Sequence, residues 1–289
     1  MARIIGGIGT SHVPAIGAAI AKGLQQDPYW KPFFDGFIPV REWLDRQKPD
    51  VVVVLYNDHG LNFFLDKLPT FAVGAASHYN NADEGWGLPV TRPFPGDPKM
   101  SWSLIESLVA DEFDITMCQE LQVDHAVSNP MALLWGAERP VKIVPVAINT
   151  VQYPLPSPAR CYKLGQAIGR AIRAYPTDAK VLVLGTGGLS HQLDGERAGF
   201  INKPFDLMCL DRLVSDPEAL TRYSVLELVE LAGTQGVELM MWIAMRGALG
   251  GKVKQVHRNY HIPISNTAAG LLLMECEDAV VPARQLVDA

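Results

Sequence analysis

The chain has 289 residues, which is long enough for one large domain or two small ones. Hydrophobic residues make up 48% and charged residues 19%, and this balance predicts a globular protein that buries a large core. The formal net charge of −6 argues against a surface for nucleic acid or for an anionic membrane, because either surface requires a basic excess.

Cysteine usage and the N-terminal sequence point to a reducing compartment. The four cysteines are scattered without a CxxC pair, so neither a Cys-rich zinc site nor a disulfide framework is indicated. The opening MARIIGGIGTSH lacks the apolar core and cleavage site of a signal peptide. No apolar run approaches the ~18 residues of a membrane-spanning helix. We therefore expect a cytoplasmic protein that makes no membrane contact.

Four apolar stretches, each followed by a polar or glycine-rich turn, are predicted to be strands. They are residues 3–8 before GTSH, 51–56 before NDHG, 142–148 before NT, and 180–184 before GTGGLSH. Their aliphatic runs lack the polar alternation of a half-exposed strand, which predicts strands covered on both faces.

Helical patterns lie between and after these strands. Residues 102–109, 162–175 and 237–249 carry apolar side chains at spacings of three and four. Alternating strands and helices predict a three-layer α/β/α single domain with a mainly parallel or mixed central sheet. We assign the domain to residues 1–275 and a C-terminal tail to residues 276–289, where periodicity is lost.

A long loop and a glycine-rich turn were tested for other functions. Residues 85–98 (GWGLPVTRPFPGDP) show neither helical nor strand periodicity, and loops of this length inside compact domains are usually functional or mobile. The GGIGTSH turn has His12 where a dinucleotide-binding motif needs a third glycine, and no phosphate-binding G-x-x-x-x-G-K-[ST] motif occurs.

Three of the seven histidines, His12, His59 and His191, come just after a predicted strand. A single histidine is more often a hydrogen-bonded residue without chemistry. Parallel strands, however, place their C-terminal ends along one edge of the sheet, so these three imidazoles are expected in one crevice. His125, which follows Asp124 in what is predicted to be a polar loop, could reach the same crevice.

A carboxylate beside two of these imidazoles would form a metal site with open coordination positions, suited to Zn, Cu, Fe or Ni. Glu238 is the candidate, because it leads an apolar helical pattern directly after the glycine-containing residues 233–236. An acid in this place can equally be a helix N-terminal residue that interacts with the helix dipole. Asn57 or Asp58 could orient a ligand, although simple capping of the strand end explains them equally well.

Six segments, in order between residues 1 and 273, resemble one family. They are MARIIGGIGTSHVPAIGAAI, DVVVVLYNDHG, ADEGWG, GTGGLSHQLDGERAGFINKPFD, GVELMMWIAMRGAL and YHIPISNTAAG. This set is similar to the type II, or LigB-like, extradiol ring-cleavage dioxygenases. Within that family it most resembles the catalytic β subunit of the protocatechuate 4,5-dioxygenase and gallate dioxygenase group.

The resemblance implies an enzyme that inserts both atoms of O₂ into a carboxylated catechol, such as protocatechuate or gallate. The ring would open next to the hydroxyls and give a product of the muconic semialdehyde type. The family's non-haem Fe(II) ligands fall on His12, His59 and Glu238 of this chain. Its acid/base histidine, in the GTGGLSH motif, falls on His191.

Two further family segments imply substrate contacts. The V-D-H segment assigns His125 as a second active-site histidine, and the S-N-T-A segment places Ser265 and Asn266 near the substrate carboxylate. The alternative for Ser265 and Asn266 is an ordinary turn. This chain departs from the protocatechuate enzymes in AVSNP after V-D-H and in LPVTRPFPGDP after ADEGWG. Both departures lie where a ring substituent would be sensed, so the resemblance supports the metal chemistry more than the choice of catechol.

The resemblance covers a catalytic subunit only and therefore implies a partner. A small, separately encoded helical α subunit would close over the active site in an α₂β₂ assembly, since only about sixteen residues follow Leu273. The alternative is that the loop at 85–98 covers the site with the help of a second copy in a homodimer. Two other functions stay open, a zinc-dependent hydrolase with the same residues and a catalytically silent metal-binding subunit.

Overall fold

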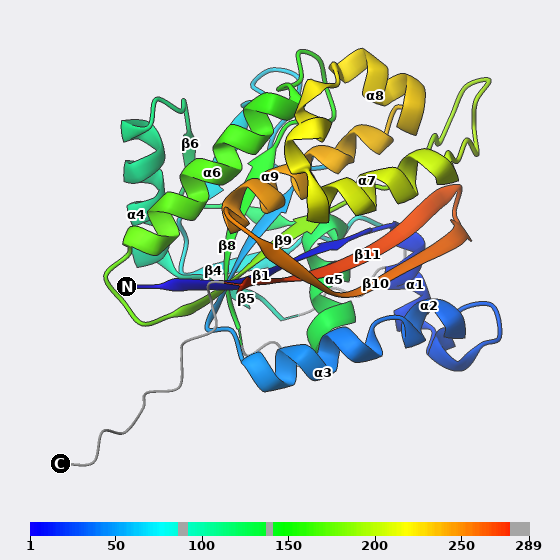
Figure 1. Cartoon of the computed structure of the whole chain (residues 1–289), viewed down its shortest axis with the longest axis horizontal. Coiled ribbons are helices and arrows are strands. Elements are labelled where there is room, and N and C mark those ends of the chain that lie inside the picture. Colours follow the sequence, from blue (N-terminus) through cyan, green and yellow to red (C-terminus); the bar gives the residue numbers. More distant parts are fainter. Residues whose placement is uncertain (86–91, 137–140, 278–289) are drawn as a thin grey trace.

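A computed structural model of the chain describes residues 1–85, 92–136 and 141–277, and its middle layer is an eight-stranded sheet (Figure 1). In chain order the strands of this sheet are β1 (Arg3–Thr10), β2 (Val51–Tyr56), β3 (Phe71–Gly74), β6 (Thr116–Cys118), β8 (Lys142–Ile148), β9 (Lys180–Thr186), β10 (Val253–Ile264) and β11 (Thr267–Cys276). In space they are ordered β10-β11-β1-β9-β2-β8-β3-β6. A second, three-stranded sheet is formed by β4 (His78–Asn81), β5 (Phe94–Pro95) and β7 (Gln122–Val123).

The four predicted strands form the parallel centre of the large sheet. β1 pairs with β9, β9 with β2, and β2 with β8, all in parallel. β2 and β8 have the predicted bounds, whereas β1 and β9 each run two residues further before their polar turns. Antiparallel pairing begins outside this centre, where β11 joins β1 and β3 joins β8. The sheet is therefore mixed.

Helices cover both faces of the sheet, which confirms the three-layer α/β/α prediction (Figure 1). One face carries α4 (Pro98–Ala110), α6 (Pro158–Ala174), α7 (Lys203–Ser215), α8 (Val225–Ala232) and α9 (Leu239–Leu249). The other carries α1 (Pro14–Ala21), α2 (Lys31–Asp35), α3 (Ile38–Gln47) and α5 (His125–Trp135). Short 3₁₀ helices are η1 (Leu24–Gln26), η2 (Pro217–Arg222) and η3 (Gly236–Glu238).

The valine run of β2 explains why both layers hold to the sheet. Alternate side chains of a strand point to opposite faces. Accordingly Val51, Val53 and Leu55 belong to the core under α6 and α9, while Val52, Val54 and Tyr56 belong to the core under α3 and α5. All six residues are buried, so polar side chains at alternate positions of β2 would be buried in one of the two cores.

The helix predicted at 162–175 is α6, and it begins earlier because of its cap. Ser157 accepts a hydrogen bond from the Arg160 N–H, and Pro158 occupies the first turn, where no N–H is needed. α6 packs on α9 at very short range through Gly165. A Cβ atom added at Gly165 would overlap the carbonyl oxygen of Ala244 on α9. This contact fixes the helix that Glu238 precedes.

Several elements lie outside the predictions. The long antiparallel hairpin β10–β11 and helices α1 to α3 were not predicted, and β5 interrupts the segment 85–98 that was expected to be irregular. Residues 86–91 of that segment and residues 278–289 of the predicted tail lie outside the described residues. β11 runs to Cys276, one residue past the predicted end of the domain.

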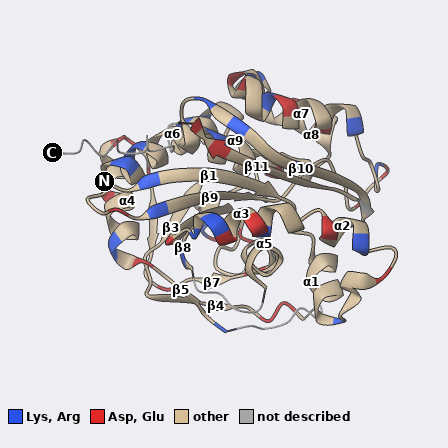
Figure 2. Ribbon diagram, turned by 60° about the horizontal axis from the view of Figure 1, so that its bottom comes forward, with Lys and Arg blue, Asp and Glu red and all other residues tan. Residues whose placement is uncertain are grey.

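Charged residues of both signs are interspersed over the described ribbon (Figure 2), in keeping with the weak negative net charge. Among the described residues, none of the helices combines the length and the hydropathy that a membrane crossing requires.

Candidate active site

The side chains singled out at the strand ends meet in one cavity of about 480 Å³. His12 follows β1, His59 follows β2 and His191 follows β9, and all three line the cavity with Glu238, the residue before α9. The three strands are mutually parallel neighbours in the sheet, so their C-terminal ends share one edge. The predicted convergence is thus present.

His12, His59 and Glu238 present ligand atoms to one another. Oε1 of Glu238 lies 3.3 Å from Nε2 of His12 and 3.7 Å from Nε2 of His59. The opposite ring nitrogens are held from behind, because Nδ1 of His12 lies 3.2 Å from Oγ1 of Thr186 and Nδ1 of His59 lies 3.0 Å from Oδ2 of Asp124. Metal-binding histidines are commonly oriented by a second contact of this kind.

Glu238 is fixed by the glycine-rich turn after β9. The Gly188 N–H donates to Oε2 of Glu238 over 2.9 Å, and Nε1 of Trp242 donates to the Gly187 carbonyl over 2.8 Å. Gly187 has a φ of 95°, and a Cβ atom there would lie 2.7 Å from Cβ of Glu238. Glycine is therefore required beside this carboxylate. Glu238 makes no side-chain cap to α9, so its carboxylate serves the histidine cluster rather than the helix end.

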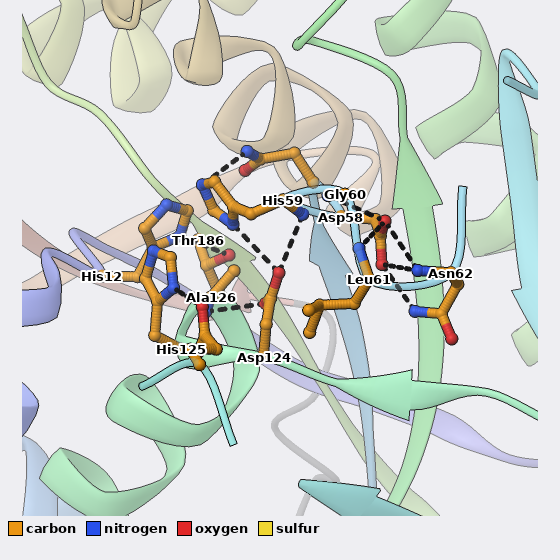
Figure 3. Close-up of polar contacts among 12 residues, drawn as sticks. His12, Asp58, His59, Gly60, Leu61, Asn62, Asp124, His125, Ala126 and Thr186 are labelled. Carbon is orange, nitrogen blue, oxygen red and sulfur yellow. Dashed lines mark hydrogen bonds and ion pairs between the residues drawn. The ribbon is translucent and has the colours of Figure 1, made fainter. Parts of the chain in front are cut away.

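His125 also belongs to the cluster. Its ring centroid lies 4.1 Å from that of His59 and 5.3 Å from that of His12 (Figure 3). His12, His59 and His125 can each offer one nitrogen within 4.8 Å of the other two, so a three-histidine metal site is a second geometric possibility. Glu84 binds His125 twice, with Oε1 2.7 Å from Nδ1 and Oε2 accepting the backbone N–H over 2.8 Å.

His191 is held by main-chain groups. Its Nδ1 lies 2.9 Å from the Leu189 carbonyl, and its backbone N–H donates to the Ala232 carbonyl over 2.8 Å. A carbonyl oxygen can only accept, so Nδ1 carries the proton of the neutral ring and Nε2 is left as the acceptor. Nε2 lies 3.7 Å from Oε2 of Glu238 in the cavity. The ring is thus arranged to take a proton.

Asn57 and Asp58 have different roles. Nδ2 of Asn57 lies 3.0 Å from Nε2 of His59 and 3.2 Å from Oε1 of Glu238, so Asn57 reaches the ligand atoms. The Asp58 carboxylate instead accepts the backbone N–H groups of Gly60 and Leu61 (Figure 3). For Asp58 the capping explanation accounts for the residue.

The cluster keeps its carboxylates ionised. Burial acts to raise the pKa of Asp124, but the His59 charge and hydrogen bonds lower it to about 2. Burial likewise acts to raise the pKa of Glu238, but His12 and then His59 hold it well below its ordinary value. Burial acts to lower the pKa of His59, but Asp124 and then Glu238 raise it to about 10. A cation bound here would replace the His59 proton.

Ser265 and Asn266 are not brought to this cavity. They form the two-residue turn between β10 and β11, with φ values of 50° and 59°, and both are exposed and outside the cavity lining. Turns of this kind need φ > 0 at both central positions, and asparagine tolerates it. Within one chain, the hairpin turn accounts for the pair, and its contact with a substrate carboxylate stays a prediction.

Some functional contacts were missed in the sequence because they join distant segments. Nδ2 of Asn129, on α5, donates to the carbonyls of His12 and Val13 over 3.2 and 3.0 Å and fixes the first histidine. Asp124 supports His59 and also caps α5 by accepting the Ala126 N–H. The sequence signal was present only for the cap, an aspartate just before a helical pattern.

Comparison with known proteins agrees with this geometry. A sequence profile described as "Catalytic LigB subunit of aromatic ring-opening dioxygenase" matches residues 6–270. The chain belongs to the LigB family. This confirms the resemblance inferred from the motifs.

Two relatives of known activity are similar to the chain in sequence. It is 42% identical to gallate dioxygenase of Pseudomonas putida over 204 residues, which cover 70% of this chain and 60% of the relative. It is 35% identical to a 2,3-dihydroxyphenylpropionate/2,3-dihydroxicinnamic acid 1,2-dioxygenase of Cupriavidus necator over 144 residues, covering 50% of this chain and 44% of the relative. The LigB-family chain thus spans about half the length of these relatives.

The fold also recurs in a protein of distant sequence. The crystal structure of the uncharacterized protein JW3007 from Escherichia coli K12 has a TM-score of 0.54 and 13% identity, covering 93% of this chain and 99% of that one. At this identity the likeness concerns the fold alone.

Proposed function

We propose that this LigB-family chain is a non-haem Fe(II)-dependent extradiol dioxygenase that inserts both atoms of O₂ into a carboxylated catechol. The observation that carries the proposal is the approach of Nε2 of His12 and Nε2 of His59 to Oε1 of Glu238 at the strand ends. Two imidazoles and one carboxylate are the ligand set of non-haem Fe(II) oxygenases.

The donor set fits a catalytic rather than a structural metal. Three protein ligands leave open positions, whereas structural sites are closed by four. A bound Fe(II) would bind the two catechol oxygens and O₂, and it would also allow electrons to pass from the catechol to O₂. His12, His59 and Glu238 would hold it, with Thr186 and Asp124 orienting the two rings.

His191 would handle the protons. Its Nε2 atom, free to accept because Nδ1 is bound to the Leu189 carbonyl, takes a proton from a substrate hydroxyl and returns it as the ring opens. His125, with Nδ1 bound to Glu84, also lines the cavity and would orient the substrate or its product with its other nitrogen.

A carboxylate-bearing ring is supported by the lining of the cavity. A buried carboxylate requires hydrogen-bond donors to offset its desolvation. Thr150 lines the cavity, and its hydroxyl is buried without a partner among the described residues. Gln235 and Thr267 line the same cavity. Ser265 and Asn266 stay a prediction that requires the exposed turn to reach a site in the assembled protein.

The experiment is anaerobic reconstitution with Fe(II) or with Zn(II), followed by an oxygen-electrode screen of protocatechuate, gallate, 3-O-methylgallate and catechol. The proposal expects O₂ uptake with Fe(II) only, and slower uptake with plain catechol than with its carboxylated relatives. Hydrolysis of a substrate by the Zn(II)-loaded protein, without O₂ uptake, would instead identify a hydrolase. Metal binding without turnover of any of the four catechols would identify a silent subunit.

The ligand assignment has its own test. His12→Ala, His59→Ala and Glu238→Ala should each lose iron while keeping the far-ultraviolet circular dichroism of the parent protein. His78→Ala, at an exposed position of β4, is the matched control and should keep its iron. A His59→Ala protein with stoichiometric iron would contradict the assignment.

A further inference from the structure

Ser190, the residue before His191, is enclosed by a polar network that the proposed chemistry does not use. Ser190 is 0% exposed, and Asp206 of α7, at 1%, faces it. Oδ1 of Asp206 accepts the Ser190 backbone N–H over 2.9 Å, and Oδ2 accepts the Ser190 hydroxyl over 2.6 Å. One carboxylate therefore binds both donors of a single serine.

The remaining polar atoms around Ser190 are also occupied. The Asn202 N–H donates to Oγ of Ser190 over 2.9 Å, and the Ala268 N–H donates to the Ser190 carbonyl over 3.0 Å. The Tyr260 hydroxyl donates to Oδ2 of Asp206 over 2.8 Å. Groups from α7, from the segment before it and from the β10–β11 hairpin thus hold one residue in place.

The peptide bond between Leu189 and Ser190 links this network to the active site. Its N–H is the group that Asp206 accepts, and its carbonyl is the group that lies 2.9 Å from Nδ1 of His191. A peptide unit is planar, so fixing the direction of its N–H also fixes the direction of its C=O. The orientation of the acceptor for the His191 ring therefore depends on a carboxylate that does not touch that ring.

We propose that Asp206 is a positioning residue for His191: by holding the Leu189–Ser190 peptide plane, it keeps the proton of the ring on Nδ1 and leaves Nε2 free toward the cavity. The importance of this arrangement for turnover rests on the proposed function, in which His191 transfers protons. The effect on the tautomer of the His191 ring does not depend on that function.

The chemistry of Asp206 supports a role beyond packing. Burial raises the pKa of Asp206 to about 6, against the lowering effect of the Ser190 and Tyr260 hydrogen bonds. Its hydrogen-bond partners among the described residues are neutral, so the fold keeps a buried anion here without a paired cation. Such burial is costly unless the charge is well satisfied by hydrogen bonds.

The deciding experiment compares Asp206→Asn and Ser190→Ala with two matched controls on α7, the helix of Asp206. Asp211→Asn makes the same chemical change at an exposed ion pair with Arg258, and Ser215→Ala removes an exposed hydroxyl. The first readout is nitrogen NMR of ¹⁵N-histidine-labelled metal-free protein, with the His191 signals assigned by their loss in His191→Phe. The parent and both controls should show His191 as the Nδ1–H tautomer, and Asp206→Asn should show a mixture of tautomers.

The second readout is turnover of the Fe(II)-loaded protein. Asp206→Asn should lower kcat by about 10- to 100-fold, the usual range for residues that orient a functional histidine, with KM and iron content close to the parent values. Ser190→Ala retains the backbone N–H bond and should give a smaller loss of the same kind. Tyr260→Phe, which leaves both bonds to Ser190, should retain the parent tautomer.

An unchanged His191 tautomer in Asp206→Asn would overturn the proposal, whether or not any catechol is consumed. If Asp206→Asn does not fold, Asp206→Ala decides, because it removes both acceptors of the Ser190 donors; an unchanged His191 tautomer in that variant overturns the proposal. Failure of the proposed function would look different. The His191 tautomer would still change in Asp206→Asn, but neither the parent nor any variant would consume O₂.

Discussion

The histidines of the cavity differ in the atom that holds Nδ1. For His59 this is the Asp124 carboxylate, and for His191 it is a main-chain carbonyl. A carboxylate partner increases the basicity of a ring and suits a metal ligand. A carbonyl partner fixes the tautomer without adding a charge, and it leaves the ring free to gain and lose a proton. For these two rings, the surroundings match the proposed roles of ligation for His59 and proton transfer for His191.

His191→Phe should keep iron and bind catechol but lose turnover by on the order of 10²–10⁴-fold, the usual contribution of a general acid or base. Iron content by metal analysis and O₂ uptake at saturating substrate would measure the two effects separately. The comparison is His12→Ala, which should lose the iron itself. Loss of iron from His191→Phe would show that His191 is a ligand.

His125→Ala distinguishes the two metal sites that the geometry allows. With iron on His12, His59 and Glu238, this variant should keep its iron and lose turnover, because His125 only faces the substrate. With iron on the three histidines, the same variant should lose the metal, and Glu238→Gln should keep it. Metal analysis of both variants, prepared in parallel with excess Fe(II), therefore decides between the two sets.

At the scale of whole elements, the sequence predicted a strand or helix correctly where the pattern lies within one short segment of the chain. The aliphatic run of β2 and the NDHG turn after it lie side by side in the chain, so a buried strand that ends in a candidate ligand could be predicted. The parallel order of the strands then followed from their alternation with helices. The three strand-end histidines were placed correctly on that basis.

Contacts between distant segments left no such signal. Asp206 and Ser190 are sixteen residues apart, and Asn129 lies 117 residues from His12. The Ser265–Asn266 pair was interpreted through the family, although two turn-forming residues between apolar runs are also a hairpin signal. An ordinary turn at this pair was the alternative, but the hairpin was not predicted because the polar sequence of β10 (VKQVHRNYHIPI) shows no apolar run.

The crossing of α6 and α9 links packing to the metal site. Gly165→Ala would place a methyl group against the Ala244 carbonyl, so α9 must shift, and Glu238 stands directly before α9. We expect a loss of about 1–3 kcal/mol in unfolding free energy from overpacking, together with weaker retention of Fe(II). Denaturant melts and competition with an iron chelator would measure both. Lys163→Ala, exposed on the same helix, should change neither.

Asp206 should give α7 a pH-dependent contribution to stability. Its pKa is raised from 3.8 to about 6 in the folded chain, so its stabilising contribution is complete below 3.8 and is lost as the pH rises through about 6. The change corresponds to about 3 kcal/mol, at about 1.4 kcal/mol per pKa unit. The unfolding free energy of the parent, minus that of Asp206→Asn, should therefore fall between pH 4 and pH 7. A difference that is flat over this range would contradict the raised pKa.

At the scale of the whole molecule, the cavity has an apolar rim open to solvent. Val151, Tyr153 and Leu193 line the cavity and are more than half exposed, at 55%, 53% and 54%. Exposed apolar residues gathered around a cavity often mark a binding surface. A reaction that uses O₂ and a reactive ring also benefits from the exclusion of water. We therefore propose that a partner covers this rim, and we favour a small helical α subunit in an α₂β₂ assembly over a second copy in a homodimer.

The last prediction concerns that cover. The Fe(II)-loaded 289-residue chain should turn over a carboxylated catechol feebly when alone, and turnover should rise when a small helical α subunit is added. Leu193→Asp should abolish this gain while iron content stays at the parent value, because a charge on the rim opposes burial under a partner. Met117→Asp, equally exposed but on β6 at the far edge of the sheet, is the control and should keep the gain. Full turnover by the chain alone would exclude an obligatory α subunit. A concentration-dependent dimer that Leu193→Asp dissolves would then identify a second copy of the chain as the cover.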